Sequence, residues 1–431
     1  MLKKISYGVL AVILAACSSD DEILKGKRIS IFAFESSNLQ NMQRNIQVPA
    51  AQSKDNWTTF GGNAEHNLGN IEFASRPQKA FEISLDWFWQ NNFYSAPLVK
   101  NGTVYLISDK SKVLALDLAN GATVFENDLS QETDVHQGVS SIGINGEKSL
   151  VGITNQGVLF ALDAYNGKIL WQKNIQAFAK GEIKVENHQI LFADINNQLQ
   201  AFNADNGENI FVAKVGKPEE ITLSKGSSPI IVGDKIVAGF ASGELAVLDA
   251  KGNILDVDKA NPSFISDDYL SQIDGIVGSP SYVEGKVFYG SYRGPISCLK
   301  INDKGKFETV WRSDIGTLNA PLIVGDVVYV VSKDAHLMAL DARDGKLIWN
   351  SDLPLFEDVK VRETRINYFG PIMGGGVLIL ASSDGYNIHV NPKNGKVIMQ
   401  AKLHDGVQVA PIIANHNLLL VTSNAHLIGY R

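Results

Sequence analysis

The chain has 431 residues, of which 45% are hydrophobic, and its formal net charge at pH 7 is −7. This acidic balance argues against the basic surfaces that bind nucleic acids or anionic lipid headgroups. With only two cysteines in the sequence, disulfides cannot form a framework, so a large hydrophobic core must hold the fold together.

The first sixteen residues have the features of a secretory signal. Lys3 and Lys4 give a basic start, and residues 5–16 form an apolar run that is too short to span a bilayer. The run ends in small residues before Cys17 and resembles the lipobox of bacterial lipoproteins, so Cys17 is the predicted lipid attachment site. The residue after Cys17 is Ser18 and not Asp, which resembles the sorting signal of lipoproteins that are carried to the outer membrane. The alternative is an ordinary signal peptide with a chance cysteine.

Residues 17–50 are polar and lack periodicity, which predicts a lipidated tether between the membrane and a folded body at residues 51–431. Removal of residues 1–16 would leave 37 basic and 46 acidic residues, a net charge of −9. The segment Trp57–Asn63 is expected to plug or cap the start of the body.

One unit of about 45 residues recurs along the body. Its clearest copy, Ala320–Trp349, joins two Val-rich strands, a Leu-x-Ala-Leu-Asp strand, an Asp-Gly turn and a strand that contains Trp349. Aligned on the last residue of the third strand, the copies fall at Asp117, Asp163, Asn203, Asp249, Lys300, Asp341, Asn391 and Arg431. Four short strands in each unit, without helical periodicity, predict an all-β fold, an eight-bladed β-propeller of four-stranded antiparallel blades.

The last unit ends with the chain at Arg431 and lacks its fourth strand. A segment of the missing character, Ala80–Trp89, precedes the first unit. We predict that this N-terminal strand pairs with the final strand and completes the last blade, because a ring closed in this way leaves no open inner edge.

The sequence contains no recognisable catalytic or metal-binding motif. His-Glu-x-x-His, Cys-x-x-Cys, a Walker-type loop and Gly-x-Ser-x-Gly are all absent, and the eight histidines are scattered. We therefore assign no catalytic residue, metal ligand or cofactor. The remaining features are interpreted as structural: Cys298 as a buried hydrophobe, Asp194–Asn197 and Gly374–Gly376 as hairpin turns, Trp171, Trp311 and Trp349 as packing between blades, and Lys360, Arg362 and Arg365 as a neutralised loop with a weak partner contact as the alternative.

The repeat resembles the propeller shared by the pyrroloquinoline-quinone (PQQ) dehydrogenases and the BamB-type outer-membrane β-barrel assembly lipoproteins. The enzymes of that group have calcium-binding acids and an adjacent pair of cysteines, which a chain with Cys298 alone beside Cys17 cannot make. The lipobox, tether, length and eight units resemble the second group. That resemblance implies a non-catalytic scaffold on the outer membrane of a Gram-negative bacterium. It would face the periplasm, bind the periplasmic domains of the barrel-inserting subunit BamA and assist nascent β-barrel proteins.

The family's partner-binding loops match two long insertions, Lys214–Lys225 and Asp256–Asp274, in adjacent units. The residues matched as partner-binding are Leu223, Ser224, Lys225, Gln272 and Asp274. Lys225 stands where the family has Arg, and a Lys side chain cannot form the two parallel hydrogen bonds that Arg makes to a carboxylate. Gln272 stands where the family has an acidic residue.

Two other functions stay open. A periplasmic quinoprotein would show calcium- and quinone-dependent dye reduction and an acidic cluster in the central channel. A ligand-binding propeller would show an aromatic platform at a channel mouth, and the sequence indicates no such aromatic cluster.

Overall fold

The computed structural model describes residues 44–85, 95–130, 138–216, 223, 225–260 and 275–431, all within one compact unit. The signal peptide, Cys17, Ser224, Gln272 and Asp274 lie outside the described residues. No helix occurs in the described ranges, so none there is long and apolar enough to cross a membrane.

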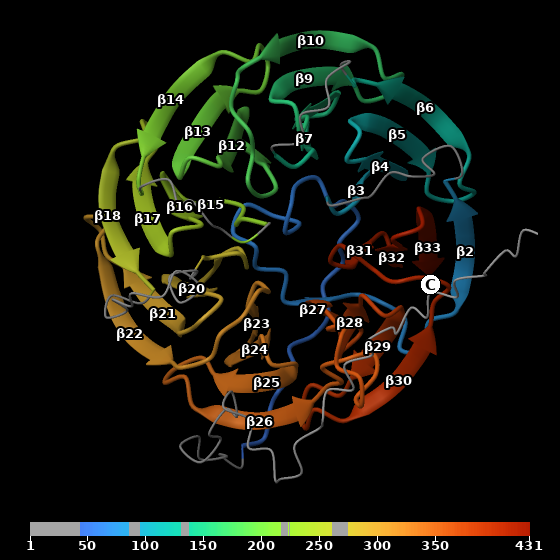
Figure 1. The fold of residues 1–431 in the computed structure, drawn as a ribbon, viewed down its shortest axis with the longest axis vertical. Helices are drawn as coiled ribbons and strands as arrows, with labels where there is room; N and C mark the ends of the chain where they lie inside the picture. The colour runs from blue at the N-terminus through green and yellow to red at the C-terminus, as the bar shows by residue number, and fades with distance from the viewer. Residues whose placement is uncertain (1–43, 86–94, 131–137, 217–222, 224, 261–274) are drawn as a thin grey trace, which may run out of the picture. The chain divides into compact units, whose positions relative to one another are not determined.

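Eight four-stranded antiparallel sheets follow one another around a ring and confirm the predicted propeller (Figure 1). The first four blades are β3 (Leu98–Lys100), β4 (Thr103–Ile107), β5 (Lys112–Asp117) and β6 (Thr123–Asp128); β7 (Ser141–Asn145), β8 (Ser149–Ile153), β9 (Val158–Asp163) and β10 (Ile169–Asn174); β11 (Lys184–Glu186), β12 (Gln189–Ala193), β13 (Gln198–Asn203) and β14 (Asn209–Lys214); and β15 (Ile230–Val232), β16 (Lys235–Gly239), β17 (Glu244–Asp249) and β18 (Ile254–Lys259).

The other four blades are β19 (Ser281–Val283), β20 (Lys286–Gly290), β21 (Ile296–Ile301) and β22 (Phe307–Ser313); β23 (Leu322–Val324), β24 (Val327–Val331), β25 (His336–Asp341) and β26 (Leu347–Asp352); β27 (Tyr368–Gly374), β28 (Val377–Ser382), β29 (Tyr386–Val390) and β30 (Val397–Lys402); and β31 (Ile412–Ala414), β32 (Asn417–Val421) and β33 (His426–Tyr430) with β2 (Lys79–Ser84). A short strand, β1 (Asn70–Ile71), adds to β27 in parallel.

The core lies in the middle strands of each blade. All five residues of β24 are buried, whereas β10 on the rim is exposed along most of its length. Val, Ile and Leu dominate the middle strands because both faces of a blade pack against neighbouring blades. Cys298 lies fully buried on β21, as expected.

The ring closes as predicted. Strand β2 pairs antiparallel with β33, with Phe81 opposite Gly429 and Ile83 opposite Leu427. Backbone hydrogen bonds in both directions between Gln78 and Arg431 extend the pair to the end of the chain. The strand begins at Lys79 and ends at Ser84, short of the expected Trp89, and residues 86–94 lie outside the described part.

A glycine in each hairpin before the outermost strand sets the contact between blades. Gly345 has a φ of 72°, and a Cβ there would come within 2.5 Å of the Trp311 ring on the preceding blade. The same contact recurs at Gly121 with Ile83, Gly167 with Phe125, Gly207 with Trp171, Gly252 with Phe211, Gly305 with Leu255 and Gly395 with Trp349. The tryptophans therefore pack between blades, as predicted, and Ile83 of the closing strand takes the corresponding position.

The segment before β2 crosses the ring and contacts the inner strands, so we call residues 44–73 the plug (Figure 1). Its backbone contacts join Trp57 to Val99, Thr58 to Ile144, Ala64 to Ile231, Glu65 to Tyr282 and Lys54 to Asn415. These partners lie at or next to the first hairpin of their blades, so the plug covers one face of the ring. Residues 44–50, which the sequence places in the tether, belong to it, and Ile46 is buried.

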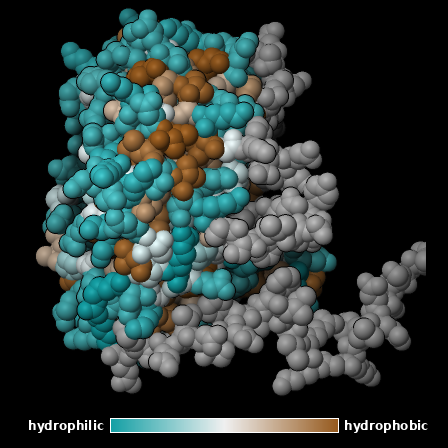
Figure 2. Space-filling view, turned by 90° about the vertical axis from the view of Figure 1, so that its left-hand side faces the viewer, coloured by the Kyte–Doolittle hydropathy of each residue, from teal (hydrophilic) through white to brown (hydrophobic). Residues whose placement is uncertain are grey.

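Apolar side chains also stand on the outer wall, where the rim strands have one unpaired edge. Figure 2 shows such side chains gathered on the side that carries β14 and β18. The exposed residues there are Ile210, Val212, Ile254 and Val257.

Candidate functional site

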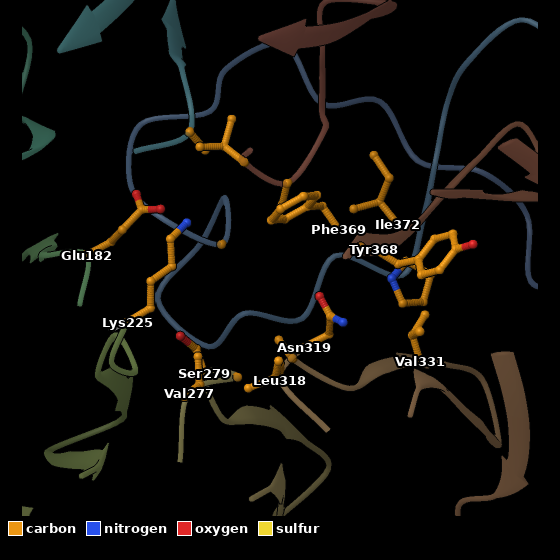
Figure 3. Close-up of a pocket in the computed structure, with 18 of the residues that line it drawn as sticks. Glu182, Lys225, Val277, Ser279, Leu318, Asn319, Val331, Tyr368, Phe369 and Ile372 are labelled. Carbon is orange, nitrogen blue, oxygen red and sulfur yellow. The ribbon is translucent and has the colours of Figure 1, made fainter. Parts of the chain in front are cut away.

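A cavity of about 510 Å³ lies at the centre of the ring (Figure 3). Its walls are the connectors that lead from the outermost strand of one blade to the innermost strand of the next, and Trp57, Phe60 and His66 of the plug form its floor. Connectors of this type lie on the face opposite the first hairpins. The cavity therefore belongs to the open face, and the plug closes the other.

A carboxylate and an ammonium group share one side of this cavity. Glu182, between β10 and β11, accepts a hydrogen bond of 2.8 Å from the Ser95 hydroxyl. Burial raises the pKa of Glu182 to about 7, although Lys225 and Ser95 counteract the rise. The Lys225 ammonium donates to the Gln408 carbonyl at 3.2 Å, and burial lowers its pKa while Glu182 opposes that shift.

Below the floor, Lys184 ties the plug to the ring. Its side chain is fully buried, and its ammonium donates to the carbonyls of Phe60 at 2.6 Å and Asn63 at 2.8 Å. Burial lowers the pKa of Lys184 to about 7. The ammonium thus satisfies two carbonyl groups of a segment without regular secondary structure, which need a donor when they are buried.

His66 is held in one tautomer by a backbone carbonyl. Its Nδ1 lies 3.0 Å from the Pro280 oxygen and must donate, which leaves Nε2 as an acceptor. Burial, followed by the charge of Lys184, lowers the pKa of His66 well below its ordinary value, so the ring is neutral at pH 7. Nε2 of His66 and Nε1 of Trp57 are buried and have no hydrogen-bond partner among the described residues.

The structure places the predicted partner-binding residues only in part. Leu223 and Lys225 both line the cavity, on the connector from β14 to β15, while Ser224, Gln272 and Asp274 fall outside the described ranges. The second insertion is shorter than expected, because residues 256–259 continue strand β18. Asp258 makes an ion pair of 2.7 Å with Arg312 there, so these residues belong to the blade.

Sequence reasoning missed the aromatic side of the cavity. Tyr368 and Phe369, at the start of β27, line it opposite Glu182, and the Lys225 ammonium lies 5.9 Å from the centre of the Phe369 ring (Figure 3). The expectation that no aromatic cluster stands at the channel was therefore wrong. The only available signal was the irregular Phe369-Gly370-Pro371, which interrupts an otherwise regular strand.

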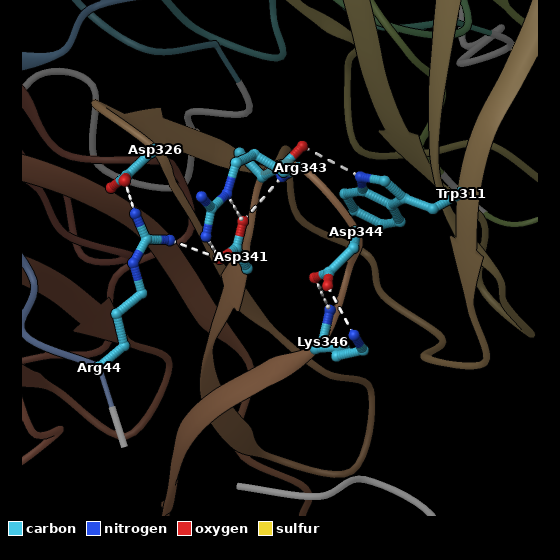
Figure 4. A network of polar contacts seen from close by, with 8 residues as sticks. Arg44, Trp311, Asp326, Asp341, Arg343, Asp344 and Lys346 are labelled. Carbon is cyan, nitrogen blue, oxygen red and sulfur yellow. Dashed lines mark hydrogen bonds and ion pairs between the residues drawn. The ribbon is translucent and has the colours of Figure 1, made fainter. Parts of the chain in front are cut away.

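A second polar cluster holds the start of the plug on the closed face (Figure 4). Arg44 forms ion pairs with Asp326 and Asp341, at 2.5 Å from Asp341 Oδ2. Hydrogen bonds from Arg343, together with the charge of Arg44, lower the pKa of Asp341 to about 2 against the opposing effect of burial. Asp341 also accepts a 2.9 Å bond from the Arg343 amide, the turn role predicted for this position.

Two other polar segments singled out in the sequence have local structural contacts in the described part of the chain. No set of three or more His, Cys, Asp or Glu residues is arranged there to hold a metal ion. Asp194 accepts hydrogen bonds from the amides of Asn196 and Gln198, which confirms a hairpin turn. In the basic loop, the Arg365 guanidinium donates to the Lys333 carbonyl at 2.6 Å.

Comparison with known proteins is consistent with this geometry. A family model described as outer membrane protein assembly factor BamB matches residues 127–351. The BamB proteins of Yersinia pestis and Escherichia coli K12 are 24% and 25% identical, and each match covers 82% of this chain and 88% of the relative. The crystal structure of BamB from Moraxella catarrhalis superposes with a TM-score of 0.70 at 16% identity over 83% of this chain and all of that one.

A quinohemoprotein alcohol dehydrogenase from Comamonas testosteroni has a TM-score of 0.65 at 12% identity, over 88% of this chain and 81% of that one. Likeness at that level reflects a shared propeller fold and carries no statement about activity. Because the matched family model spans more than half of the sequence, this chain belongs to the family of the outer membrane protein assembly factor BamB.

Proposed function

We propose that this chain is a non-catalytic scaffold of the machinery that assembles outer-membrane proteins. The observation that carries the proposal is its membership of a family whose curated members are named as assembly factors. The fold suits such a role, because a closed ring of eight blades holds its connectors in fixed positions on one face. The lipid on Cys17 would anchor the protein to the outer membrane, facing the periplasm.

The partner in this proposal is the periplasmic part of a BamA-type barrel-inserting protein, with nascent β-barrel proteins as clients. The contact surface in this proposal consists of Leu223, Ser224, Lys225, Gln272 and Asp274, of which Leu223 and Lys225 belong to the described residues. Leu223 would supply apolar contact area. Lys225 and Asp274 would orient the partner by charge.

The outer wall supports a second mode of contact with the same clients. The rim strands β14 and β18 each have one unpaired edge and exposed apolar side chains, including Val212 and Val257. An extended segment of a client could add to such an edge as a further strand.

Affinity purification of the acylated full chain from detergent-solubilised envelopes tests the scaffold role. We expect recovery of a large integral barrel protein with periplasmic domains. Leu223→Asp combined with Asp274→Lys should reduce this recovery, whereas Lys251→Asp, at an exposed position of the hairpin between β17 and β18, should leave it unchanged.

Each arm of this experiment has a contrary outcome. If the wild-type chain recovers no barrel protein, the scaffold function is wrong. If the double variant recovers as much as the wild type, the function stands but the contact surface lies elsewhere. Calcium- and quinone-dependent dye reduction by the purified chain would contradict the non-catalytic assignment.

A further inference from the structure

We propose that the central cavity is a binding site for a neutral organic molecule that carries a hydroxyl group on an aromatic or aliphatic body. The volume of the cavity, about 510 Å³, lies in the range of pockets that bury a small organic molecule. The connectors form its walls and the plug forms its floor, so a ligand there would contact both. The proposal does not depend on the scaffold function, which concerns the rim of the same face.

The first indication of a ligand is a set of buried polar atoms in residues that line the cavity. The indole N–H of Trp57, Nε2 of His66 and the side-chain oxygen of Gln408 have no hydrogen-bond partner in the described part of the chain. Trp57 and His66 are only 3% and 7% exposed. Because buried polar groups of native proteins are normally paired, unpaired ones beside a cavity indicate that the content of the cavity pairs with them.

These unpaired atoms need both a donor and an acceptor. The indole N–H of Trp57 can only donate, and the side-chain oxygen of Gln408 can only accept. Burial lowers the pKa of His66 well below its ordinary value, so the ring is neutral, and because Nδ1 donates to the Pro280 carbonyl at 3.0 Å, Nε2 can only accept. A hydroxyl group both donates and accepts without carrying a charge, whereas an ether oxygen only accepts.

The charged side chains of the wall already have partners within the protein. Glu182 accepts a hydrogen bond of 2.8 Å from a serine hydroxyl, Lys225 donates to a backbone carbonyl at 3.2 Å, and the Lys333 ammonium lies 5.7 Å from the centre of a tyrosine ring. Lys180 also interacts with other groups of the chain. A charged ligand would lose its hydration and would have to displace such contacts to gain a counter-charge, whereas a neutral ligand leaves them in place.

The remaining wall is apolar and fits the body of the ligand. Figure 3 shows Tyr368, Phe369 and Ile372 across the cavity from Glu182, and Leu318 also lines it. A ring or alkyl chain would be buried against these side chains, while its hydroxyl group pairs with the polar atoms of the lining. This is the usual composition of a small-molecule site, in which a few polar groups orient a ligand that apolar contacts hold.

Equilibrium dialysis of the full acylated chain in lipid nanodiscs tests the site, with empty discs as the control for partition into lipid. The probes are 3-phenylpropan-1-ol, its methyl ether, 3-phenylpropionate and 3-phenylpropylammonium. We expect the alcohol to bind at least ten-fold more tightly than the ether, which cannot donate to His66 or Gln408 and would leave them unpaired. We also expect it to bind at least ten-fold more tightly than either ion.

Two variants locate the binding in the cavity. His66→Phe should reduce the preference for the alcohol over the ether, and Phe369→Ala should weaken binding of the alcohol at least ten-fold, whereas Tyr165→Ala, at an exposed position between β9 and β10, should have no effect. Phe369→Ala alone decides this arm if His66→Phe fails to fold. Equal binding of alcohol and ether, equal binding of the alcohol and an ion, no binding above empty discs, an undiminished preference in folded His66→Phe, or wild-type affinity of Phe369→Ala would overturn the proposal.

Discussion

Replacement of Gly345 by alanine should destabilise the propeller by driving two blades apart. Gly345 lies in the hairpin between β25 and β26, with a φ of 72°. A Cβ at this position would lie 2.5 Å from the ring of Trp311. That ring is 7% exposed, and its N–H donates to the Ala342 carbonyl at 3.0 Å, so it has little freedom to move away.

Two costs add at this position, and a matched control separates them. An L-residue in the left-handed region costs about 1–2 kcal/mol, and overpacking of a well-packed contact costs about 1–3 kcal/mol. Gly102 has a φ of 77°, and a Cβ there would meet no atom within 4 Å, so Gly102→Ala incurs the first cost alone. Gly345→Ala should therefore lower the free energy of unfolding by about 1–3 kcal/mol more than Gly102→Ala does.

Urea unfolding followed by tryptophan fluorescence measures this difference, with the slope of the transition as a check that both variants unfold like the wild type. Trp311→Leu in the Gly345→Ala background should recover part of the loss, because a smaller side chain leaves room for the methyl group. Equal destabilisation by Gly345→Ala and Gly102→Ala would refute the reasoning, since it would mean that the Trp311 side chain moves aside without loss of stability.

Three further results are expected. Gly429→Ala should destabilise the ring, because a Cβ there would lie 2.3 Å from the Phe81 ring, and Phe81→Ala should make that change less costly, as a double-mutant cycle would show. Between pH 5 and pH 8, the wild type should lose about 2 kcal/mol of stability relative to Glu182→Gln. Burial raises the pKa of Glu182 from 4.5 to about 7, so the protonated carboxyl group favours the folded state below pH 4.5, and this contribution is lost as the pH rises through about 7. Arg44→Ala should speed proteolytic cleavage near residue 44, because it removes both ion pairs of the plug.

Each result has its contrary. Additive effects of the two changes at β2 and β33 would show that Phe81 and Gly429 do not contact each other. A pH-independent difference between Glu182→Gln and the wild type in thermal unfolding would mean that the carboxyl group is solvated in the folded state. Cleavage of Arg44→Ala at the wild-type rate, with Lys173→Ala on the rim as the control, would show that the ion pairs do not hold the plug.

The blade pattern was predictable because it is local. The hairpin glycine, which follows Asn or Asp in five of the seven hairpins, and the next apolar residue lie within a few positions of one another, and each blade repeats the same packing problem. Even the distant pairing of β2 with β33 could be inferred, since a ring with seven complete units and one incomplete unit has a single place for a spare strand.

The path of the plug and the composition of the cavity could not be predicted in this way. Trp57, His66 and the segment around them have no period, and their contacts are made with strands that are up to hundreds of residues away in the sequence. Glu182 stands on the connector from β10 to β11, whereas Phe369 lies at the start of β27, after a connector of different length, so no spacing in the sequence relates one to the other. Only the closed ring brings them to the same space.

The two faces of the ring thus differ for a physical reason that bears on function. Apart from β1, the plug has no regular secondary structure, so its backbone groups need other partners, and it finds them at the first hairpins and at the buried ammonium of Lys184. Arg44, the first described residue of the plug, is bound to hairpins of that same face. The connectors, the cavity and Lys225 lie on the opposite face, where the plug does not cover the surface that a ligand or a partner would contact.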